Sequence, residues 1–384
     1  MKKFFLLALI FAHVFTSGEQ ALANTSELTW QIAEIIELIL ERYVGEPVTA
    51  QELTEAALAG MTSILDDFSV FMTTREFSDY TDSLNNRYVG IGVTILGVEE
   101  KIIFREVFAG GPGYIAGLLP GDILISVDDV EVIGASVSEV VDMIRGEEGL
   151  VKIEVERLEE ILAFEIIRGS IERDSVSLVN LENNPEISLE ARSDSRILDY
   201  AYIRVVSVGD ETANEFRAAL EQISDARGLI LDLRGNSGGY LNTTVELANM
   251  LVPAGPILTA YTNFGQSYAP VSTLENAPFY GKIIVLTDQS TASAAEVIAS
   301  ALQDSGAAIV VGQTTYGKGL IQSTFISELG VLKLTTEEFF RRNGETLNGV
   351  GVIPDIYVDN MLEYVDGNWR DLALEIAVYT LFDM

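Results

Sequence analysis

Ser293 is the residue of this sequence whose position best suits nucleophilic chemistry. It follows a continuous apolar run, Ile283 to Leu286, and a polar turn, and apolar residues at helical spacing come after it. A serine at such a turn from strand to helix can lie exposed above a sheet, near the positive end of the helix. Serine is also common as a plain helix cap, and position alone favours that simpler role.

The composition decides which base can activate a serine here. The 384-residue chain contains no cysteine, and its single histidine is His13. Residues 1–23 have the form of a signal peptide, with a basic start, an apolar run from Phe4 to Val14 and a small-residue cleavage site. Cleavage before Asn24 would remove the histidine, which excludes Ser-His-Asp and thiol catalysis, disulfides and the usual structural zinc sites. We expect no metal and no cofactor, and lysine is the recognised alternative base.

Lys318 stands between Gly317 and Gly319, soon after the strand-helix-strand unit that contains Ser293. A lysine acts as a general base only when it is neutral, whereas a free lysine, with a pKa near 10.4, is charged at neutral pH. Burial disfavours the ammonium form and lowers this pKa. The stretch from Thr315 to Leu320 includes no acid, so it is consistent with a neutral lysine. An exposed loop lysine is the simpler alternative.

The formal net charge is −34, and a chain this acidic repels nucleic acid and anionic membranes. The apolar run of the signal peptide is shorter than the roughly twenty residues that span a bilayer. We therefore expect an exported protein that does not bind nucleic acid, located in a periplasm, in a lumen or outside the cell.

Patterning divides the rest of the chain into three regions. Residues 24–84 carry apolar residues at helical spacing, which predicts helices that pack on the body or on a second copy of the chain. Residues 85–168 alternate apolar and polar residues in short runs around one helix, which predicts a small β-rich module. Residues 169–384 alternate strands and helices, which predicts an α/β core with a mainly parallel sheet.

Two turns of this core follow buried strands. One is the glycine-rich turn after Leu233, and the other is the turn before Ser293. Because ligands of α/β cores bind beyond the carboxyl ends of strands, both turns are expected to open onto one crevice. Asp232 and Arg234, beside the first turn, can form a buried ion pair, to which we assign no chemistry.

Four blocks of sequence resemble the C-terminal processing peptidases, also called tail-specific proteases. The blocks are YVGIGV with AGLLPGD and ILISVDD within 88–167, LDLRGNSGG at 231–239, TASAAEVIASALQDSGAAIVVGQTTYGKGLIQ at 291–322 and GVGVIPDI at 349–356. One block alone would be weak, but the set follows the family order. Two departures occur: TASAA replaces the family's SASAS but keeps the middle hydroxyl, and Asp128-Asp129-Val130 replaces a PDZ turn usually written with Asn-Gly or Asp-Gly.

The resemblance implies an α/β fold class, with a crotonase/ClpP-like peptidase core, an inserted β-rich PDZ domain and an N-terminal helical region. It implies a periplasmic serine endopeptidase that acts through a Ser-Lys dyad. Ser293 is then the nucleophile, Lys318 the general base and Gln322 the residue that orients the lysine.

The resemblance also implies an oxyanion hole. Its donors would be the N–H of Ala294, next to the nucleophile, and the N–H of Gly238 or Gly239, since glycine lets the backbone approach a substrate closely. Asp304 matches a family aspartate, and we interpret it as structural.

The PDZ-like region implies a way of choosing substrates. PDZ domains bind a peptide as an added strand and hold its terminal carboxylate with backbone N–H groups. Gly90-Ile91-Gly92-Val93 matches the family's carboxylate loop, although an ordinary strand start is the simpler alternative. The expected partners are proteins or peptides with free, apolar C-termini, and an adaptor protein or a second copy of the chain stays open.

Two other functions stay open at this point. A catalytically silent PDZ adaptor on a peptidase scaffold is disfavoured because Ser293, Lys318 and Gln322 are all present. An acyl-CoA-type enzyme would share a crotonase-like core, but neither the PDZ-like region nor Lys318 supports that function.

Overall fold

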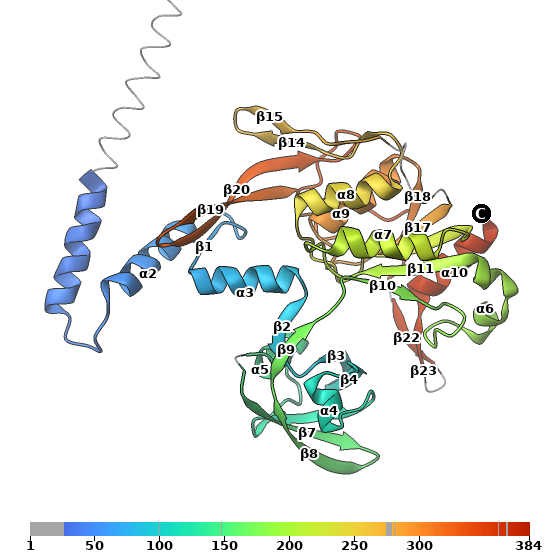
Figure 1. The fold of residues 1–384 in the computed structure, drawn as a ribbon, viewed down its shortest axis with the longest axis horizontal. Coiled ribbons are helices and arrows are strands. Elements are labelled where there is room, and N and C mark those ends of the chain that lie inside the picture. The colour runs from blue at the N-terminus through green and yellow to red at the C-terminus, as the bar shows by residue number, and fades with distance from the viewer. Residues whose placement is uncertain are drawn as a thin grey trace, which may run out of the picture. The chain divides into compact units, whose positions relative to one another are not determined.

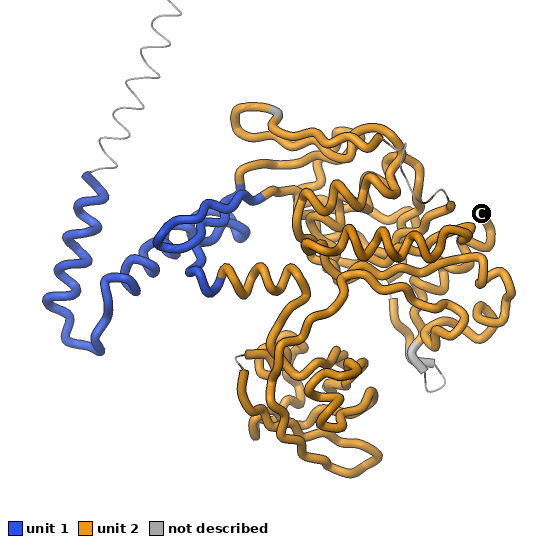
Figure 2. The backbone as a smooth tube through the Cα atoms, viewed as in Figure 1, with its two compact units in different colours: residues 1–76, 322–335 blue, residues 77–321, 336–384 orange. Residues whose placement is uncertain are grey.

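The computed structural model describes residues 27–98, 100–146, 148–273, 279, 281–359, 361–365 and 368–384 (Figure 1). The predicted signal peptide, residues 1–23, lies outside these ranges and stays a prediction. The chain divides into two compact units, of which unit 1 comprises residues 1–76 and 322–335 and unit 2 comprises residues 77–321 and 336–384 (Figure 2). Among the helices of the described residues, none has the length and apolar character needed to cross a membrane.

Unit 1 contains a helix over residues 27–42, helix α2 (Ala50–Thr62) and strand β1 (Val70–Met72). Helix α2 begins at a capping box, in which the Glu52 N–H donates to Thr49 Oγ1 and the Glu52 carboxylate accepts the Thr49 N–H. Strand β1 pairs antiparallel with β20 (Gly330–Phe340), which also pairs with β19 (Leu320–Ser327). The strand β1 is an element that the helical pattern of residues 24–84 did not indicate.

The β-rich module of unit 2 follows helix α3 (Thr74–Leu84). Its sheet has the order β3-β4-β5-β7-β8, with β6 beside β5, and its helices are α4 and α5. The bounds are β3 (Val93–Val98), β4 (Lys101–Val107), α4 (Pro112–Ala116), β5 (Ile123–Val127), β6 (Val130–Glu131), α5 (Val137–Ile144), β7 (Leu150–Arg157) and β8 (Glu160–Ile167). Strand β2 (Arg87–Gly90) pairs with β9 (Gly169–Glu172) at the two ends of the module.

The turn between β5 and β6 is tight although it lacks glycine. Val127 pairs with Val130, so the turn has two residues, and both have a left-handed backbone, with φ of 49° at Asp128 and 65° at Asp129. Aspartate tolerates this conformation better than most residues, and a two-residue turn of this kind matches the twist of the flanking strands. The departure from the usual turn sequence therefore leaves the hairpin intact.

The α/β core of unit 2 is a sheet of order β10-β11-β12-β17-β18-β21. The strands from β11 to β21 are parallel and β10 is antiparallel at one edge, so the predicted mainly parallel sheet is confirmed. The bounds are β10 (Val176–Val179), β11 (Tyr200–Val205), β12 (Gly228–Asp232), β17 (Lys282–Thr287), β18 (Ala308–Gly312) and β21 (Ile356–Tyr357).

Helices cover both faces of this sheet (Figure 1). Leu229 and Leu231 belong to one core cluster, with residues of α7 (Thr212–Gln222), α8 (Leu241–Leu251) and α9 (Ala294–Asp304). Ile230 belongs to a second cluster, with residues of α6 (Leu189–Ser193) and α10 (Leu372–Asp383). Because both faces are covered, β12 and β17 contain unbroken apolar runs, Leu229 to Leu231 and Ile283 to Leu286, as the sequence predicted.

Shorter elements complete unit 2. They are the 3₁₀ helix η1 (Ser195–Asp199) and the strands β13 (Gly255–Pro256), β14 (Thr259–Thr262), β15 (Gly265–Tyr268), β16 (Val271–Ser272), β22 (Leu362–Val365) and β23 (Asn368–Asp371). At the end of α9, the nearly buried Asp304 accepts hydrogen bonds from the Arg341 guanidinium at 2.6 and 3.2 Å. This buried ion pair confirms the structural interpretation of Asp304.

Candidate active site

Ser293 occupies a strained turn between β17 and α9. Its φ of 52° and ψ of −113° form a combination that is rare for any residue with a side chain. Ala294, the next residue, is the first residue of α9. Ser293 therefore stands beyond the carboxyl end of β17 and at the positive end of a helix, as the sequence predicted for a nucleophile.

The glycine-rich loop after β12 lies against this turn. The Ala292 N–H donates to the Asn236 carbonyl at 2.9 Å. Gly238 approaches so closely that an added Cβ would lie 2.9 Å from Ser293 Cβ and 3.0 Å from the Ala294 nitrogen. These contacts confirm that the two predicted turns meet.

Backbone donors near Ser293 are the candidates for an oxyanion hole. The Ala294 N–H belongs to the first turn of a helix, where N–H groups have no intrahelical acceptor. The Gly238 N–H, in contrast, donates to Asn236 Oδ1 at 2.9 Å inside its own loop. That bond makes Gly239 the better candidate of the two glycines for the second donor.

Replacing Gly238 by alanine is expected to lower kcat/KM for a cleaved peptide by about 100-fold, because the new methyl group would displace the nucleophile turn. The φ of Gly238 is +106°, which adds backbone strain. Gly235→Ala is the matched control, since Gly235 belongs to the same loop, has φ of +73° and has open space at its Cβ position. Equal activity of the two variants in a peptide-cleavage assay would contradict the assigned contact.

Lys318 lies half-buried in the loop between β18 and β19. Its backbone N–H donates to Glu296 Oε2 at 2.8 Å, and the Ser293 N–H donates to the same oxygen at 2.8 Å. The fold thus brings the backbones of the predicted nucleophile and the predicted base to one carboxylate. Sequence reasoning missed Glu296, although Ser293 followed by an acid three residues later is a capping-box pattern that would have indicated it.

Gln322 belongs to unit 1, whereas Ser293 and Lys318 belong to unit 2. Its side-chain amide donates to Thr335 Oγ1 at 3.2 Å, across the pair of strands β19 and β20. The Thr335 hydroxyl donates in turn to Asp66 Oδ1 at 3.0 Å. The proposed action of Gln322 on Lys318 stays a prediction from the resemblance.

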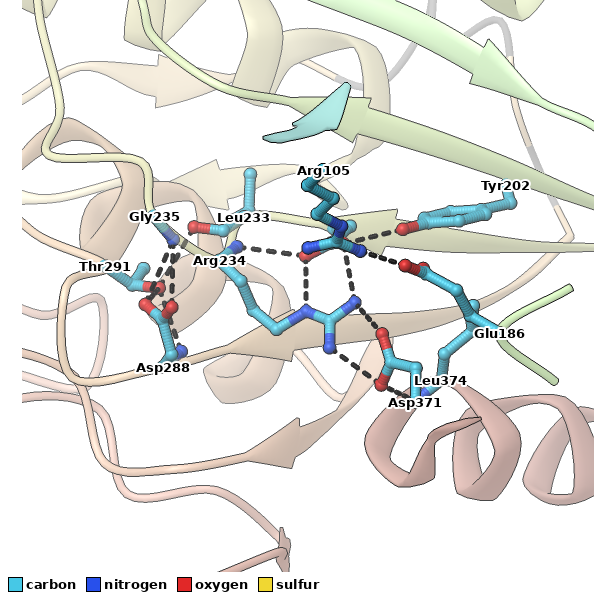
Figure 3. Close-up of polar contacts among 11 residues, drawn as sticks. Arg105, Glu186, Tyr202, Leu233, Arg234, Gly235, Asp288, Thr291, Asp371 and Leu374 are labelled. Atoms are coloured by element: carbon cyan, nitrogen blue, oxygen red, sulfur yellow. Dashed lines mark hydrogen bonds and ion pairs between the residues drawn. The ribbon is translucent and has the colours of Figure 1, made fainter. Parts of the chain in front are cut away.

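A buried ionic network lies beside the glycine-rich loop (Figure 3). Arg234 donates to both oxygens of Asp232, at 2.8 and 2.9 Å, and to Asp371 at 2.7 and 2.9 Å. The Tyr202 hydroxyl donates to Asp232 at 2.7 Å. Burial raises the pKa of Asp232, but the charge and hydrogen bonds of Arg234 outweigh burial and hold that pKa below its ordinary value.

The network continues toward both the PDZ-like module and the nucleophile turn (Figure 3). On one side, Arg105 of β4 donates to the Glu186 carboxylate, and the Glu186 carbonyl accepts the Asp371 N–H. On the other side, Asp288 accepts hydrogen bonds from the Gly235 N–H and from Thr291 Oγ1, each at 3.0 Å. The ionic network and Asp288 therefore hold the glycine-rich loop after β12 in place.

A groove of about 290 Å³ lies along the PDZ-like module. The predicted carboxylate loop, Gly90 to Val93, connects β2 to β3 and lines the groove. Apolar side chains of β3 and α5 also line it, among them Ile95, Val137, Val141 and Ile144. This is the arrangement of strand, helix and loop that accepts a peptide as an added strand.

Two arginines flank this groove. The Arg145 guanidinium carbon lies 4.7 Å from the centre of the Tyr88 ring, and that of Arg173 lies 3.8 Å from the centre of the Phe108 ring. Each cation is held over an aromatic face. Arg173 also forms an ion pair with Glu106 at 3.4 Å, which offsets its charge, so Arg145 is the better placed of the two to attract a carboxylate.

Among the described residues, no group of three or more His, Cys, Asp and Glu side chains is arranged to hold a metal ion.

Comparison with known families agrees with this geometry. The family model described as "Peptidase family S41" matches residues 199–358, and the model described as "PDZ domain" matches residues 103–157. The carboxy-terminal processing protease CtpB of Bacillus subtilis is 31% identical over 336 residues, which are 85% of this chain and 67% of that protein. The carboxy-terminal-processing protease of Bartonella bacilliformis is 28% identical over 361 residues, which are 90% of this chain and 78% of that protein.

Two solved structures are similar over most of the chain. The photosystem II D1 C-terminal processing protease has a TM-score of 0.53 and 25% identity, and the match covers 82% of this chain and 84% of that one. A putative S41 protease from Bacteroides fragilis has a TM-score of 0.56 and 16% identity, covering 89% and 91%, and supports the fold alone.

Proposed function

Because the chain belongs to the carboxy-terminal processing proteases of peptidase family S41 and contains a PDZ domain, we propose that it cleaves protein tails through a Ser293–Lys318 dyad. The observation that carries this proposal is the convergence at one carboxylate of the backbone of a strained serine and the backbone of a half-buried lysine. Without cysteine, and with a single histidine in the predicted signal peptide, the chain offers lysine as the base.

In the proposed mechanism, Ser293 Oγ attacks the scissile carbonyl carbon while neutral Lys318 Nζ takes the hydroxyl proton. The tetrahedral intermediate collapses, the C–N bond breaks, and Lys318 returns the proton to the leaving amine. Water then attacks the acyl-enzyme ester, with Lys318 again as the base, and releases the second product. The N–H groups of Ala294 and Gly239 are the proposed donors to the oxyanion.

For substrate choice, we propose that the groove of the PDZ domain captures a free C-terminus. The loop from Gly90 to Val93 would hold the carboxylate, Arg145 would attract it, and the apolar wall would take the last side chains. Charge-assisted hydrogen bonds to a carboxylate contribute roughly 1.5–3 kcal/mol each, so loss of the charge has a measurable cost.

A peptide ending in Leu-Ala-Ala with a free carboxylate is expected to be cleaved about 10-fold faster than the same peptide with an amidated end. Mass spectrometry of the products at matched times measures the ratio. Gly92→Asp should bring the ratio close to one, because it places a negative charge in the carboxylate loop. Gly110→Asp is the matched control, since Gly110 has a similar φ of +79°, against +75° at Gly92, and open space at its Cβ position.

The same assay addresses the remaining alternatives. Equal rates for the two peptides in the unmodified protein would mean that the groove does not read C-termini. If the unmodified protein and the Ser293→Ala variant both bind the free peptide and neither cleaves it, the result would favour the silent adaptor.

A further inference from the structure

Glu296 is a fully buried carboxylate in the first turn of α9, and the mechanism proposed above assigns it no role. A buried carboxylate costs free energy unless hydrogen bonds satisfy it. The partners of Glu296 therefore indicate what its burial serves.

Each oxygen of Glu296 accepts two hydrogen bonds. Oε2 accepts the backbone N–H of Ser293 and that of Lys318, both at 2.8 Å. Oε1 accepts the Gly317 N–H at 2.7 Å and the hydroxyl of Thr315. An ionised carboxylate is an acceptor only, and four donors match that state.

This arrangement goes beyond helix capping. Glu52 and Glu139 occupy the same third position in the capping boxes of α2 and α5, where each is exposed and accepts hydrogen bonds from the cap residue of its own helix. Glu296 accepts one such bond and also reaches a second loop more than twenty residues along the chain. Its carboxylate thus joins the turn at Ser293 to the loop that contains Lys318.

Thr315 fixes the direction of one of these bonds. Its hydroxyl accepts the Val352 N–H at 2.6 Å, which leaves the hydroxyl proton to donate to Glu296. The Gly317 carbonyl, two residues on, accepts the Gly349 N–H at 2.8 Å. The loop that contains Lys318 is therefore held between Glu296 and the segment 349–352, so two of the four family-like sequence blocks, 291–322 and 349–356, meet at this loop.

We propose that Glu296 is a positioning residue that fixes the backbone separation of Ser293 and Lys318 for proton transfer. The proposal rests on the proposed Ser-Lys function. Misplacement of reacting groups by about 1 Å can cost about 100-fold in rate, and a carboxylate that holds both backbones is suited to prevent it.

Glu296→Gln tests the proposal, because an amide has one acceptor oxygen and its NH₂ group would face two N–H or O–H donors. With the free Leu-Ala-Ala peptide we expect kcat to fall about 100-fold and KM to stay within about twofold. Labelling of Ser293 by a fluorophosphonate probe should slow by a similar factor. Glu52→Gln, which removes the equivalent capping carboxylate of α2, should keep both constants within about twofold.

Thr315→Val provides a second variant in case Glu296→Gln does not fold, which the absence of a cooperative unfolding transition on heating would show. It removes one donor to the carboxylate, and we expect kcat to fall about 10-fold. A folded Glu296→Gln or Thr315→Val variant with unchanged kcat would overturn the proposal, and so would a change confined to KM or an equal loss in Glu52→Gln. If Ser293→Ala retains full activity, the Ser-Lys function itself fails and the positioning role fails with it; if only Ser293→Ala is inactive, the positioning role alone fails.

Discussion

Ser293→Ala and Lys318→Ala are each expected to lower kcat/KM for the free Leu-Ala-Ala peptide by at least about 10³-fold. The serine variant lacks the attacking oxygen, and the lysine variant lacks the group that takes its proton. Both side chains can be removed without opening the core, since Lys318 is half-buried and alanine fits the turn before α9. Initial rates by chromatography, with the melting temperature as the check on folding, measure the effect.

Two controls separate this loss from general damage. Ser290→Ala removes an exposed hydroxyl of the same turn, and Lys101→Ala removes an exposed lysine of β4, so both should stay within about twofold of the unmodified protein. The double variant Ser293→Ala with Lys318→Ala should be no slower than Ser293→Ala alone, because residues that act as one unit are not additive. Full activity in either single variant would contradict the dyad.

Arg234→Met is expected to lower the free energy of unfolding by about 3–5 kcal/mol, because it leaves two buried carboxylates without their cation. Asp232 and Asp371 are 1% and 2% exposed, and the Arg234 guanidinium is hydrogen-bonded to both. Urea denaturation at pH 7 measures the change. Arg227→Met is the control, since Arg227 pairs with Asp199 at the exposed surface, where such pairs contribute about 0–1 kcal/mol.

The loss in Arg234→Met should depend on pH in a defined direction. The pKa of Asp232 lies below its ordinary value of 3.8 in the folded protein, because Arg234 outweighs the opposing effect of burial. The ion pair therefore stabilises the fold at pH values above 3.8, and this stabilisation is lost as the pH falls through the lowered pKa. The difference in free energy of unfolding between the unmodified protein and Arg234→Met should be largest near neutral pH and should become smaller in acid. If Arg234→Met lost no more stability than Arg227→Met at pH 7, the assigned role would be contradicted.

Local chain chemistry made several parts of the site predictable. The apolar run Ile283 to Leu286 predicted a strand covered on both faces, and β17 is such a strand. The capping patterns at Thr49 and Ser136 predicted the starts of α2 and α5. The position of Ser293 between a strand and a helix predicted the turn that it occupies before α9. Each of these features depends on residues within a few positions of one another, which a pattern can register.

Contacts between distant segments escaped the same reasoning. The residues around Lys318 include no acid, yet the fold places the Glu296 carboxylate against the Lys318 backbone. That contact has no signal in the residues beside Lys318, because it depends on how loops from different strands meet. The bond from the Gly238 N–H to Asn236 Oδ1, in contrast, joins residues two positions apart, and a local pattern could have indicated it.

The sequence by itself determined which chemistries were open to the chain. With no cysteine and one histidine near the start, it indicated lysine as the base for the proposed serine nucleophile, and its strand-and-helix pattern predicted a site beyond the carboxyl ends of parallel strands. Only the tertiary structure decided which groups meet there. It joined the Ser293 turn to the Lys318 loop through Glu296 and set Gly238 against the nucleophile. The physical reason is that composition and periodicity are properties of the chain, whereas a hydrogen bond between residues more than twenty positions apart exists only after the sheet has brought its loops to one edge.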